Sequence, residues 1–223
     1  MLPRWLKRRY QLARLGDPSY KFLFEPGPAD EAVAIDCETT GLDPRKDDII
    51  TVAAVKIRGN RILTSERFEA TLRPSVRINP EAIKIHWLRE RDVAMGRAMA
   101  EVLPPLLRFI GGRPLIGYYL EFDLAMLDRY VRRWLGIELP NPAIEVSKLY
   151  YDRKYADAPP GTHIDLAFPS ILRDLGLPML DQHDAYADAL MTAMIYLVLR
   201  DRKARGVRIA RSGYASITPI SGE

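Results

Sequence analysis

Two carboxylates, Asp36 and Glu38, stand two positions apart at the end of a short apolar run, residues 33–37. Residues at i and i+2 of a β-strand point to the same face, so the two side chains converge if this run is a strand. A buried carboxylate pair without a cation loses hydration and suffers mutual repulsion. A hard cation such as Mg²⁺ relieves both penalties. The pattern therefore indicates a divalent-metal site; the structural alternative is that Glu38 caps the turn that follows.

Further candidates for chemistry lie near residue 185, and each has a structural alternative. Asp184 and Asp188 are spaced i,i+4 on one face of a predicted helix and could pair as ligands. Asp184 fits better as a negative charge at the helix N-terminus. His183 directly precedes this helix, and an imidazole with a pKa of about 6.5 suits general-base catalysis near neutral pH; the alternative is a solvated residue. Cys37 points to the opposite strand face and is expected in the core.

Three segments in chain order resemble the motifs of the DnaQ-like, or DEDDh, 3′–5′ exonucleases. The first is DCETTGL at residues 36–42, and the second is PLIGYYLEFD at residues 114–123, with Asp123 as its carboxylate. The third is HDAYADA at residues 183–189, where His183 lies five residues before Asp188. The resemblance covers roughly residues 32–199. On these motifs the chain is identified as a member of that family, similar to the exonuclease domain of the polymerase III epsilon-subunit type.

The resemblance implies hydrolysis of phosphodiester bonds at the 3′ end of DNA, preferentially single-stranded, with two divalent ions, Mg²⁺ or Mn²⁺. In such enzymes two metal ions stabilise the attacking and leaving oxygens. By resemblance, Asp36 would bridge the ions, Glu38 and Asp188 would complete one site, and Asp123 would serve the other. His183 would accept the proton of the attacking water. Asp128 is a weaker rival of Asp123, and His163 is expected in a surface loop.

Substrate contacts are expected around the first two motifs and one further segment. Backbone amides after the ligand pair would hold the terminal nucleotide, Leu42 would wedge against its base, and a tyrosine would stack on a base. The expected contact residues are Thr39, Thr40, Gly41, Leu42, His86, Tyr118 and Tyr119. Adjacent strand residues face opposite ways, so only one of the two tyrosines should be available. The family usually has His-Asn where this chain has the tyrosine pair, and glycine where it has Trp87.

Two other functions stay open at this stage. An RNA-trimming exoribonuclease would use the same catalytic set, with contacts to the 2′-OH as the discriminator. A catalytically inactive nucleic-acid-binding module is the second alternative, against which the full set of carboxylates argues. A polymerase or repair protein is a candidate partner, since the sequence shows no polymerase domain.

The elements that must position these residues follow from periodicity and turn signals. Apolar runs predict strands at 33–37, 49–57 and 61–72, joined as an antiparallel meander with a turn at Gly59-Asn60, and a fourth strand at 114–117. Helical spacing predicts helices at 81–87, 98–110, 122–134, 164–175 and 184–200, although Pro104-Pro105 conflicts with the second. Residues 144–150 fit a strand or a helix, and 151–162 a surface loop. This order predicts an α/β protein, a ribonuclease H-like mixed β-sheet flanked by helices.

Charge is distributed unevenly along the 223 residues, which carry 33 basic and 29 acidic side chains. Residues 1–21 have a net charge of +5 and residues 200–223 of +4, so residues 22–199 carry −5. We expect a basic N-terminal appendage (1–30), an exonuclease domain (31–202) and a disordered tail (203–223). The appendage either attracts a polyanion or docks through its apolar residues on the body or a partner. One cysteine, no signal peptide and no membrane span predict a cytoplasmic protein.

Overall fold

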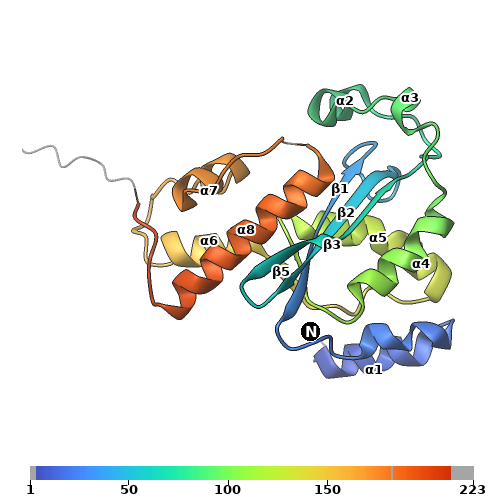
Figure 1. Cartoon of the computed structure of the whole chain (residues 1–223), viewed down its shortest axis with the longest axis horizontal. Helices are drawn as coiled ribbons and strands as arrows, with labels where there is room; N and C mark the ends of the chain where they lie inside the picture. Colours follow the sequence, from blue (N-terminus) through green and yellow to red (C-terminus); the bar gives the residue numbers. More distant parts are fainter. Residues whose placement is uncertain (1–3, 182, 212–223) are drawn as a thin grey trace, which may run out of the picture.

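The computed structural model describes residues 4–181 and 183–211 and consists of a mixed sheet covered by helices on both faces (Figure 1). The sheet has the strand order β3-β2-β1-β4-β5. Its strands are β1 (Glu31–Thr39), β2 (Ile49–Arg58), β3 (Arg61–Thr71), β4 (Leu115–Gly117) and β5 (Ala143–Glu145). The first three form an antiparallel meander, whereas β4 and β5 run parallel to β1. The predicted ribonuclease H-like architecture is therefore confirmed.

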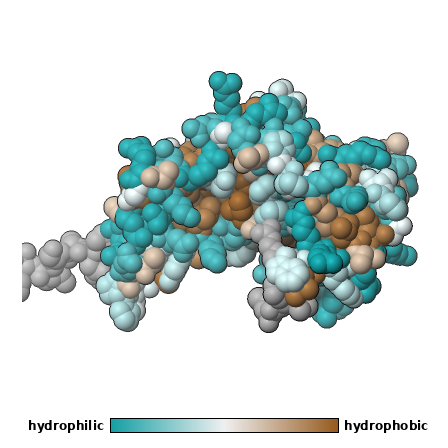
Figure 2. Space-filling view, turned by 90° about the horizontal axis from the view of Figure 1, so that it is seen from below, coloured by the Kyte–Doolittle hydropathy of each residue, from teal (hydrophilic) through white to brown (hydrophobic). Residues whose placement is uncertain are grey.

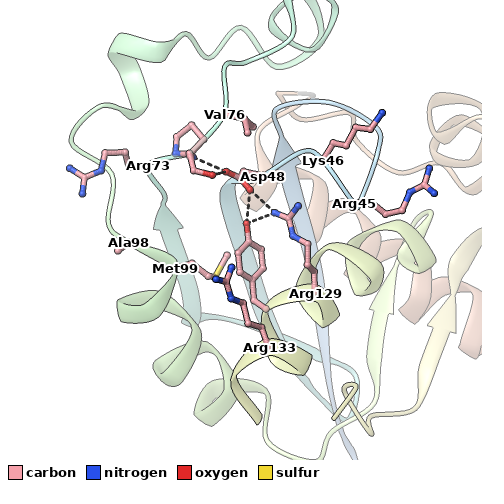
Figure 3. Close-up of a pocket in the computed structure, with 12 residues that line it drawn as sticks. Arg45, Lys46, Asp48, Arg73, Val76, Ala98, Met99, Arg129 and Arg133 are labelled. Atoms are coloured by element: carbon pink, nitrogen blue, oxygen red, sulfur yellow. Dashed lines mark hydrogen bonds and ion pairs between the residues drawn. The ribbon is translucent and has the colours of Figure 1, made fainter. Parts of the chain in front are cut away.

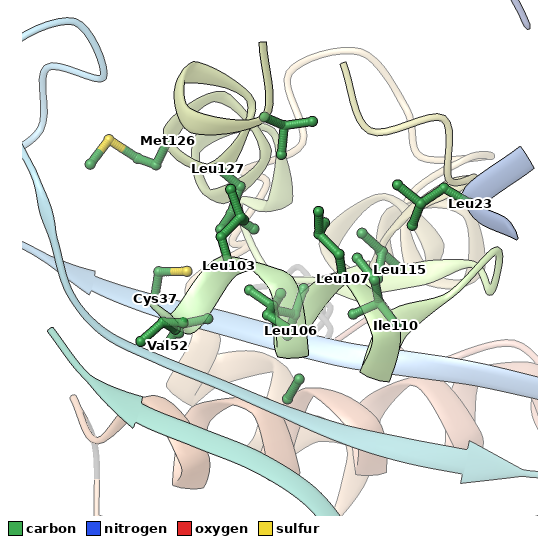
Figure 4. Packing of buried hydrophobic residues seen from close by; sticks show 14 of the residues in the cluster. Leu23, Cys37, Val52, Leu103, Leu106, Leu107, Ile110, Leu115, Met126 and Leu127 are labelled. Atoms are coloured by element: carbon green, nitrogen blue, oxygen red, sulfur yellow. The ribbon is translucent and has the colours of Figure 1, made fainter. Parts of the chain in front are cut away.

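Side chains of β1 alternate between two hydrophobic cores, one on each face of the sheet. Val33, Ile35 and Cys37 pack with α4 (Met99–Ile110) and α5 (Leu120–Leu135), as Figure 4 shows for Cys37. Ala32 and Ala34 pack in the other core. That core contains the helices α6 (Val146–Lys154), α7 (Phe168–Leu175) and α8 (Ala185–Ala204). Because successive strand residues alternate, Asp36 and Glu38 belong to the face covered by α8.

Helix α4 runs through Pro104 and Pro105 without a break. Each proline lacks a backbone N–H and so frees one carbonyl of the preceding turn. One of these, the carbonyl of Glu101, accepts a hydrogen bond from the Arg97 guanidinium (3.0 Å). The opposite face of the helix is apolar and fully buried, with Leu106 and Ile110 at 0% exposure. Burial of this face, together with the replacement hydrogen bond, accounts for a helix that proline alone argues against.

Further differences from the predicted elements lie between residues 87 and 175, where the helix predicted at 164–175 begins only at Phe168. A short helix, α3 (Glu90–Val93), follows α2 (Pro80–His86) where no element was predicted. The segment 144–150 contains both alternatives, because β5 ends where α6 begins. The predicted loop from residue 151 was wrong over its first four residues, which continue α6 to Lys154. That lysine is buried and pairs with Asp174 of α7, a long-range contact that a local pattern does not reveal.

The N-terminal segment docks on the body of the protein. It forms α1 (Arg4–Arg14) and a 3₁₀-helix, η1 (Pro18–Phe24). Tyr20, Leu23 and Phe24 are buried in the same core as α4 and α5. The backbone N–H of Gly16 also donates to the Leu135 carbonyl (2.9 Å). Docking was predicted through Trp5, Leu6 and Leu12, but these side chains are 59%, 37% and 36% exposed, and the apolar docking comes from η1 instead. The domain boundary near residue 30 stays a prediction, as does any electrostatic role.

Docking of the N-terminal segment makes a stability prediction. Tyr20→Ala removes a ring that is 3% exposed and packs edge-on against Trp134, so we expect it to destabilise the fold by about 3–5 kcal/mol. Tyr10→Ala is the matched control, since Tyr10 is 60% exposed, and should change stability by less than about 0.5 kcal/mol. Urea unfolding of the two variants measures the difference. Equal losses would contradict docking.

Viewed from below, the surface is mostly hydrophilic with separate apolar patches (Figure 2). None of the helices in the described residues is long and apolar enough to cross a membrane. Most of the predicted disordered tail, residues 212–223, lies outside the described residues. The part before it is ordered: α8 extends to Ala204, and Ile209 is buried with its N–H donating to the Arg153 carbonyl (3.1 Å).

Candidate active site

The four predicted metal-binding carboxylates lie on three elements that meet at one edge of the sheet. Asp36 and Glu38 end β1, Asp123 is in the first turn of α5, and Asp188 is in the first turn of α8. Strand β4 runs parallel to β1, so the helix that follows β4 starts at the edge where β1 ends. Helix α8 packs across β1 and β2 and places its N-terminus at the same edge. Topology thus brings together residues that are 150 positions apart.

These carboxylates repel one another in a desolvated setting. Glu38 and Asp123 are 9% and 4% exposed. Desolvation raises the pKa of Asp36 well above its usual range, and the neighbouring charges of Asp123 and Glu38 raise it further. The pKa of Asp123 is raised by burial and by Glu38, and that of Glu38 reaches about 8 through burial and Asp188. The charged groups that act on Asp36 and Glu38 are carboxylates, so the donor set fits hard divalent cations.

His183 lies beside two of the carboxylates. One ring nitrogen of His183 and one oxygen each of Glu38 and Asp188 are all within 4.8 Å of one another. The backbone N–H of His183 donates to Asp188 Oδ2 (3.0 Å), which ties the loop to the first turn of α8. The His183 side chain is exposed at the mouth of the site. This position suits a general base, and its distance to the carboxylates also suits a ligand.

The loop after β1 is fixed by its own hydrogen bonds. Thr39 Oγ1 donates to the Gly41 carbonyl (2.8 Å), and Thr40 Oγ1 donates to Asp47 Oδ1 (3.0 Å). A Cβ at Gly41 would lie 2.6 Å from the Asp47 carboxylate, so this approach requires glycine. Leu42 then projects into solvent with 80% exposure. The loop is therefore a rigid platform that ends in an exposed apolar side chain.

His86 is buried, and both its ring nitrogens have partners. Its Nδ1 accepts the N–H of Leu88 (3.1 Å), so Nε2 carries the proton and donates to the Thr39 carbonyl (3.2 Å). Burial lowers the pKa of His86. These contacts fasten the end of α2 to the end of β1. Substrate contact by His86 stays a prediction, and its observed role is to position the loop that carries Thr39.

Of the two adjacent tyrosines, only Tyr119 is exposed. Tyr118 packs against Phe168 and donates its hydroxyl to the Leu166 carbonyl (3.1 Å), whereas Tyr119 is 67% exposed. The exposure of only one tyrosine was predicted, but the expected cause, alternation along a strand, was wrong. Strand β4 ends at Gly117, and Tyr119 is the N-cap of α5 with a left-handed backbone (φ 54°). Among the described residues, the non-glycine positions with positive φ are Trp87, Tyr119 and His183. All three adjoin the candidate site.

Sequence reasoning missed residues that line or support this site. A hollow of about 350 Å³ beside His183 and His86 is lined in addition by Leu88, Glu69 and Tyr186. Glu145 holds the start of α5, since its carboxylate accepts the Leu120 N–H (2.9 Å). Leu88, Glu69 and Tyr186 come from three separate segments, and no motif marks them. Glu145 ends an apolar strand as Glu38 does, which is the one signal that could have found it.

The rival candidates have structural roles. Asp184 is the N-cap of α8 and accepts the Ala187 N–H (2.9 Å). Asp128 lies on α5 away from the other carboxylates and accepts the Leu139 N–H (2.7 Å). Cys37 is buried in the core between the sheet and α4. His163 is exposed in the loop before α7.

Fold and site together define an exonuclease domain of the ribonuclease H-like type. The family model RNase_T, described as exonuclease, matches residues 33–196. The chain therefore belongs to this exonuclease family and is DnaQ-like. The match includes Asp36, Glu38, Asp123, His183 and Asp188.

Named relatives agree with this family. The chain is 29% identical over 165 residues to the DNA polymerase III subunit epsilon of Aquifex aeolicus, which covers 74% of this chain and 78% of that protein. It is 29% identical to the PolC-type DNA polymerase III of Thermotoga maritima over 74% of this chain, but this spans only 11% of the polymerase. The zinc-bound complex of E. coli ExoI with ssDNA has a similar fold: TM-score 0.66, 17% identity, 80% of this chain and 42% of that chain.

The raised pKa values predict how pH and metal act together on stability. The folded protein holds a proton on Glu38 up to a pH of about 8, whereas the unfolded chain releases it near 4.5. The metal-free fold therefore loses stability as pH rises from about 5 to 8. Mg²⁺ competes with these protons, so the rise in melting temperature that it causes should grow over the same range. Thermal melts at four pH values, with and without Mg²⁺, test this; a Mg²⁺ effect independent of pH would contradict it.

Proposed function

We propose that this chain hydrolyses phosphodiester bonds at the 3′ end of single-stranded DNA with two divalent ions, Mg²⁺ or Mn²⁺, and with His183 as general base. The observation that carries the proposal is the convergence of four mutually repelling carboxylates and one histidine at a single edge of the sheet. Such a donor set has a chemical purpose only if cations and a negatively charged substrate are brought to it.

Each group has a defined part in this proposal. Asp36, Glu38, Asp123 and Asp188 would hold the ions, which when bound stabilise the charge that develops on the attacking and leaving oxygens. His183, at the exposed mouth, would accept the proton of the attacking water. The loop bearing Thr39 and Gly41 would hold the terminal nucleotide. Leu42 and Tyr119 present apolar surface to its bases.

Substrate and partner follow from the relatives and remain proposals. The solved neighbour named above binds ssDNA, and the Aquifex relative is named as a polymerase subunit. We infer by analogy that this chain acts on single-stranded DNA ends beside a polymerase or repair protein. The cytoplasmic location predicted from the single cysteine stays a prediction.

Release of nucleotides from matched oligonucleotides tests the proposal. Single-stranded DNA and RNA of one sequence, labelled at either end, are incubated with Mg²⁺, with Mn²⁺ or with EDTA. We expect mononucleotides from the 3′ end of DNA, and no release in EDTA. Faster release from RNA would favour the exoribonuclease alternative. Binding without any release would favour the inactive module, and release in EDTA would exclude the metal mechanism.

A further inference from the structure

A second polar hollow lies on the other side of the sheet from Asp36 and Glu38. It has a volume of about 580 Å³ and is formed by the start of α4, the outer face of α5 and the segments that follow β1 and β3 (Figure 3). We call it the basic pocket, because five cationic side chains line it: Arg45, Lys46, Arg73, Arg129 and Arg133. In the described lining, Asp48 is the single acidic residue.

Asp48 stabilises the floor of the basic pocket. It is 7% exposed, and its Oδ2 accepts the N–H (2.7 Å) and the hydroxyl (2.6 Å) of Ser75. Its Oδ1 accepts the Tyr130 hydroxyl (2.9 Å) and the Arg129 guanidinium. Every oxygen of Asp48 is thus occupied, and its charge neutralises Arg129. The remaining cations therefore determine what the pocket attracts.

Four exposed cations at the rim leave the basic pocket positive. Arg45 and Lys46 both form ion pairs with the Asp43 carboxylate, through Nε at 3.2 Å and Nζ at 3.8 Å. Arg73 and Arg133 form no ion pair with any other residue of the described ranges 4–181 and 183–211. Figure 3 shows Arg73 on one side of the hollow, and Arg45 and Lys46 on the other. Guanidinium groups around an open hollow are suited to bind phosphate oxygens.

One segment of chain separates the basic pocket from the platform that holds Thr39 and Gly41. The backbone N–H of Asp48 donates to Thr40 Oγ1 (2.9 Å), and the Thr40 N–H donates to the Asp48 carbonyl (2.9 Å). Residues 39–42 directly follow Glu38, whereas Arg45, Lys46 and Asp48 line the pocket. A nucleic acid whose end lies in the catalytic site would bring its next phosphates to this positive surface if its strand crosses residues 39–48.

We propose that the basic pocket binds backbone phosphates of the nucleic acid beyond its terminal nucleotide. Residues 22–199 carry a net charge of −5, and the carboxylates of the catalytic edge add local repulsion. A positive surface on the body offsets this repulsion without reading sequence. The phosphates belong either to the substrate strand or to a complementary strand. The proposal rests on the proposed function, because it assumes that the 3′ end occupies the catalytic site.

Charge-neutralised variants test the pocket. Arg73→Gln/Arg133→Gln is compared with the charge-retaining Arg73→Lys/Arg133→Lys. Arg61→Gln is the matched control, since Arg61 is exposed, forms no ion pair in the described residues and lies at the opposite end of the sheet beside Arg58. Binding is measured with Ca²⁺ over a range of salt concentrations, using a dinucleotide, a longer single strand and a duplex with a recessed 3′ end.

On the long ligands the Gln double variant should lower the slope of log affinity against log salt by about one for each lost phosphate contact. The Lys pair, Arg61→Gln and every dinucleotide measurement should match the wild type. A lower slope for the single strand would assign the bound phosphates to the substrate strand. A lower slope for the duplex alone would assign them to the complementary strand. Unchanged slopes on both long ligands, or an equal loss on the dinucleotide, would overturn the proposal. Failure of the wild type to hydrolyse any end would instead refute the proposed function, since the slopes need no turnover.

Discussion

Replacing Asp36 with alanine is expected to lower the rate of hydrolysis by about 10³-fold or more while leaving the protein folded. Asp36 lies at the centre of the acidic cluster, where Asp123, Glu38 and Asp188 all act on it. Metal ions supply several kcal/mol of transition-state stabilisation, and each 1.4 kcal/mol corresponds to about tenfold in rate. Because the substitution removes a repulsive charge, stability in EDTA should not fall. The stabilisation by Mg²⁺ should shrink.

Asp128→Asn is the control for this experiment. Asp128, on α5, is likewise a carboxylate whose pKa is raised by burial, to about 6. Its side chain accepts the Leu139 N–H and lies outside the acidic cluster. Asparagine keeps that hydrogen-bond acceptor, so the variant should hydrolyse at the wild-type rate. Single-turnover measurements at saturating metal compare the two proteins. A fully active Asp36→Ala protein would refute the assignment of the site.

The second large effect is expected at His183. Asparagine is the informative substitution, because it tolerates the left-handed backbone at this position (φ 64°) and removes the imidazole. We expect His183→Asn to reduce the rate at saturating metal by about 10²–10⁴-fold, the range of general-base catalysis. Metal affinity should change little, since the carboxylates are the proposed ligands. His163→Asn, in an exposed loop, is the control.

The arrangement of Glu38, His183 and Asp188 gives this experiment a second informative result. Their donor atoms lie within 4.8 Å of one another, so a direct metal–imidazole bond is the competing role. In that case the metal affinity of His183→Asn would collapse, and the rate would recover at high metal concentration. Titration of the melting temperature with Mn²⁺, alongside rates at each concentration, separates a base from a ligand.

Much of the fold could be predicted because its signals are local. The strands at 33–37, 49–57 and 61–72 follow from apolar runs and a Gly-Asn turn, and the structure confirms all three. Residues 151–154 were assigned to a loop because their polar pattern hides the pairing of Lys154 with Asp174, twenty positions away. The packing of Tyr20 against Trp134 was missed for the same reason. Contacts between distant segments leave no periodicity in the sequence.

Only part of the catalytic site could be predicted from residue spacing, and the rest depended on the resemblance to the exonuclease motifs. Asp36 and Glu38 could be paired from strand geometry, but Asp123 and Asp188 enter only through motifs that the topology later brings together. The basic pocket was not anticipated, because Arg73 and Arg133 belong to different elements and look like ordinary surface charges. The net charge of residues 22–199 even pointed away from a positive surface on the body. Local concentration of charge depends on the fold and not on composition.

Non-glycine residues with positive φ near the site imply a trade-off between catalytic activity and stability of the fold. Trp87, Tyr119 and His183 each hold a side chain at positive φ, a conformation that costs about 1–2 kcal/mol relative to glycine. Glycine at any of these positions would relax the backbone, but at 119 and 183 it would also delete an exposed aromatic ring or the imidazole beside the carboxylates. A library selected only for survival at high temperature should therefore accumulate glycine at 119 and 183 and lose nuclease activity as it does so, whereas glycine at 87, which the family usually has, should leave activity in place.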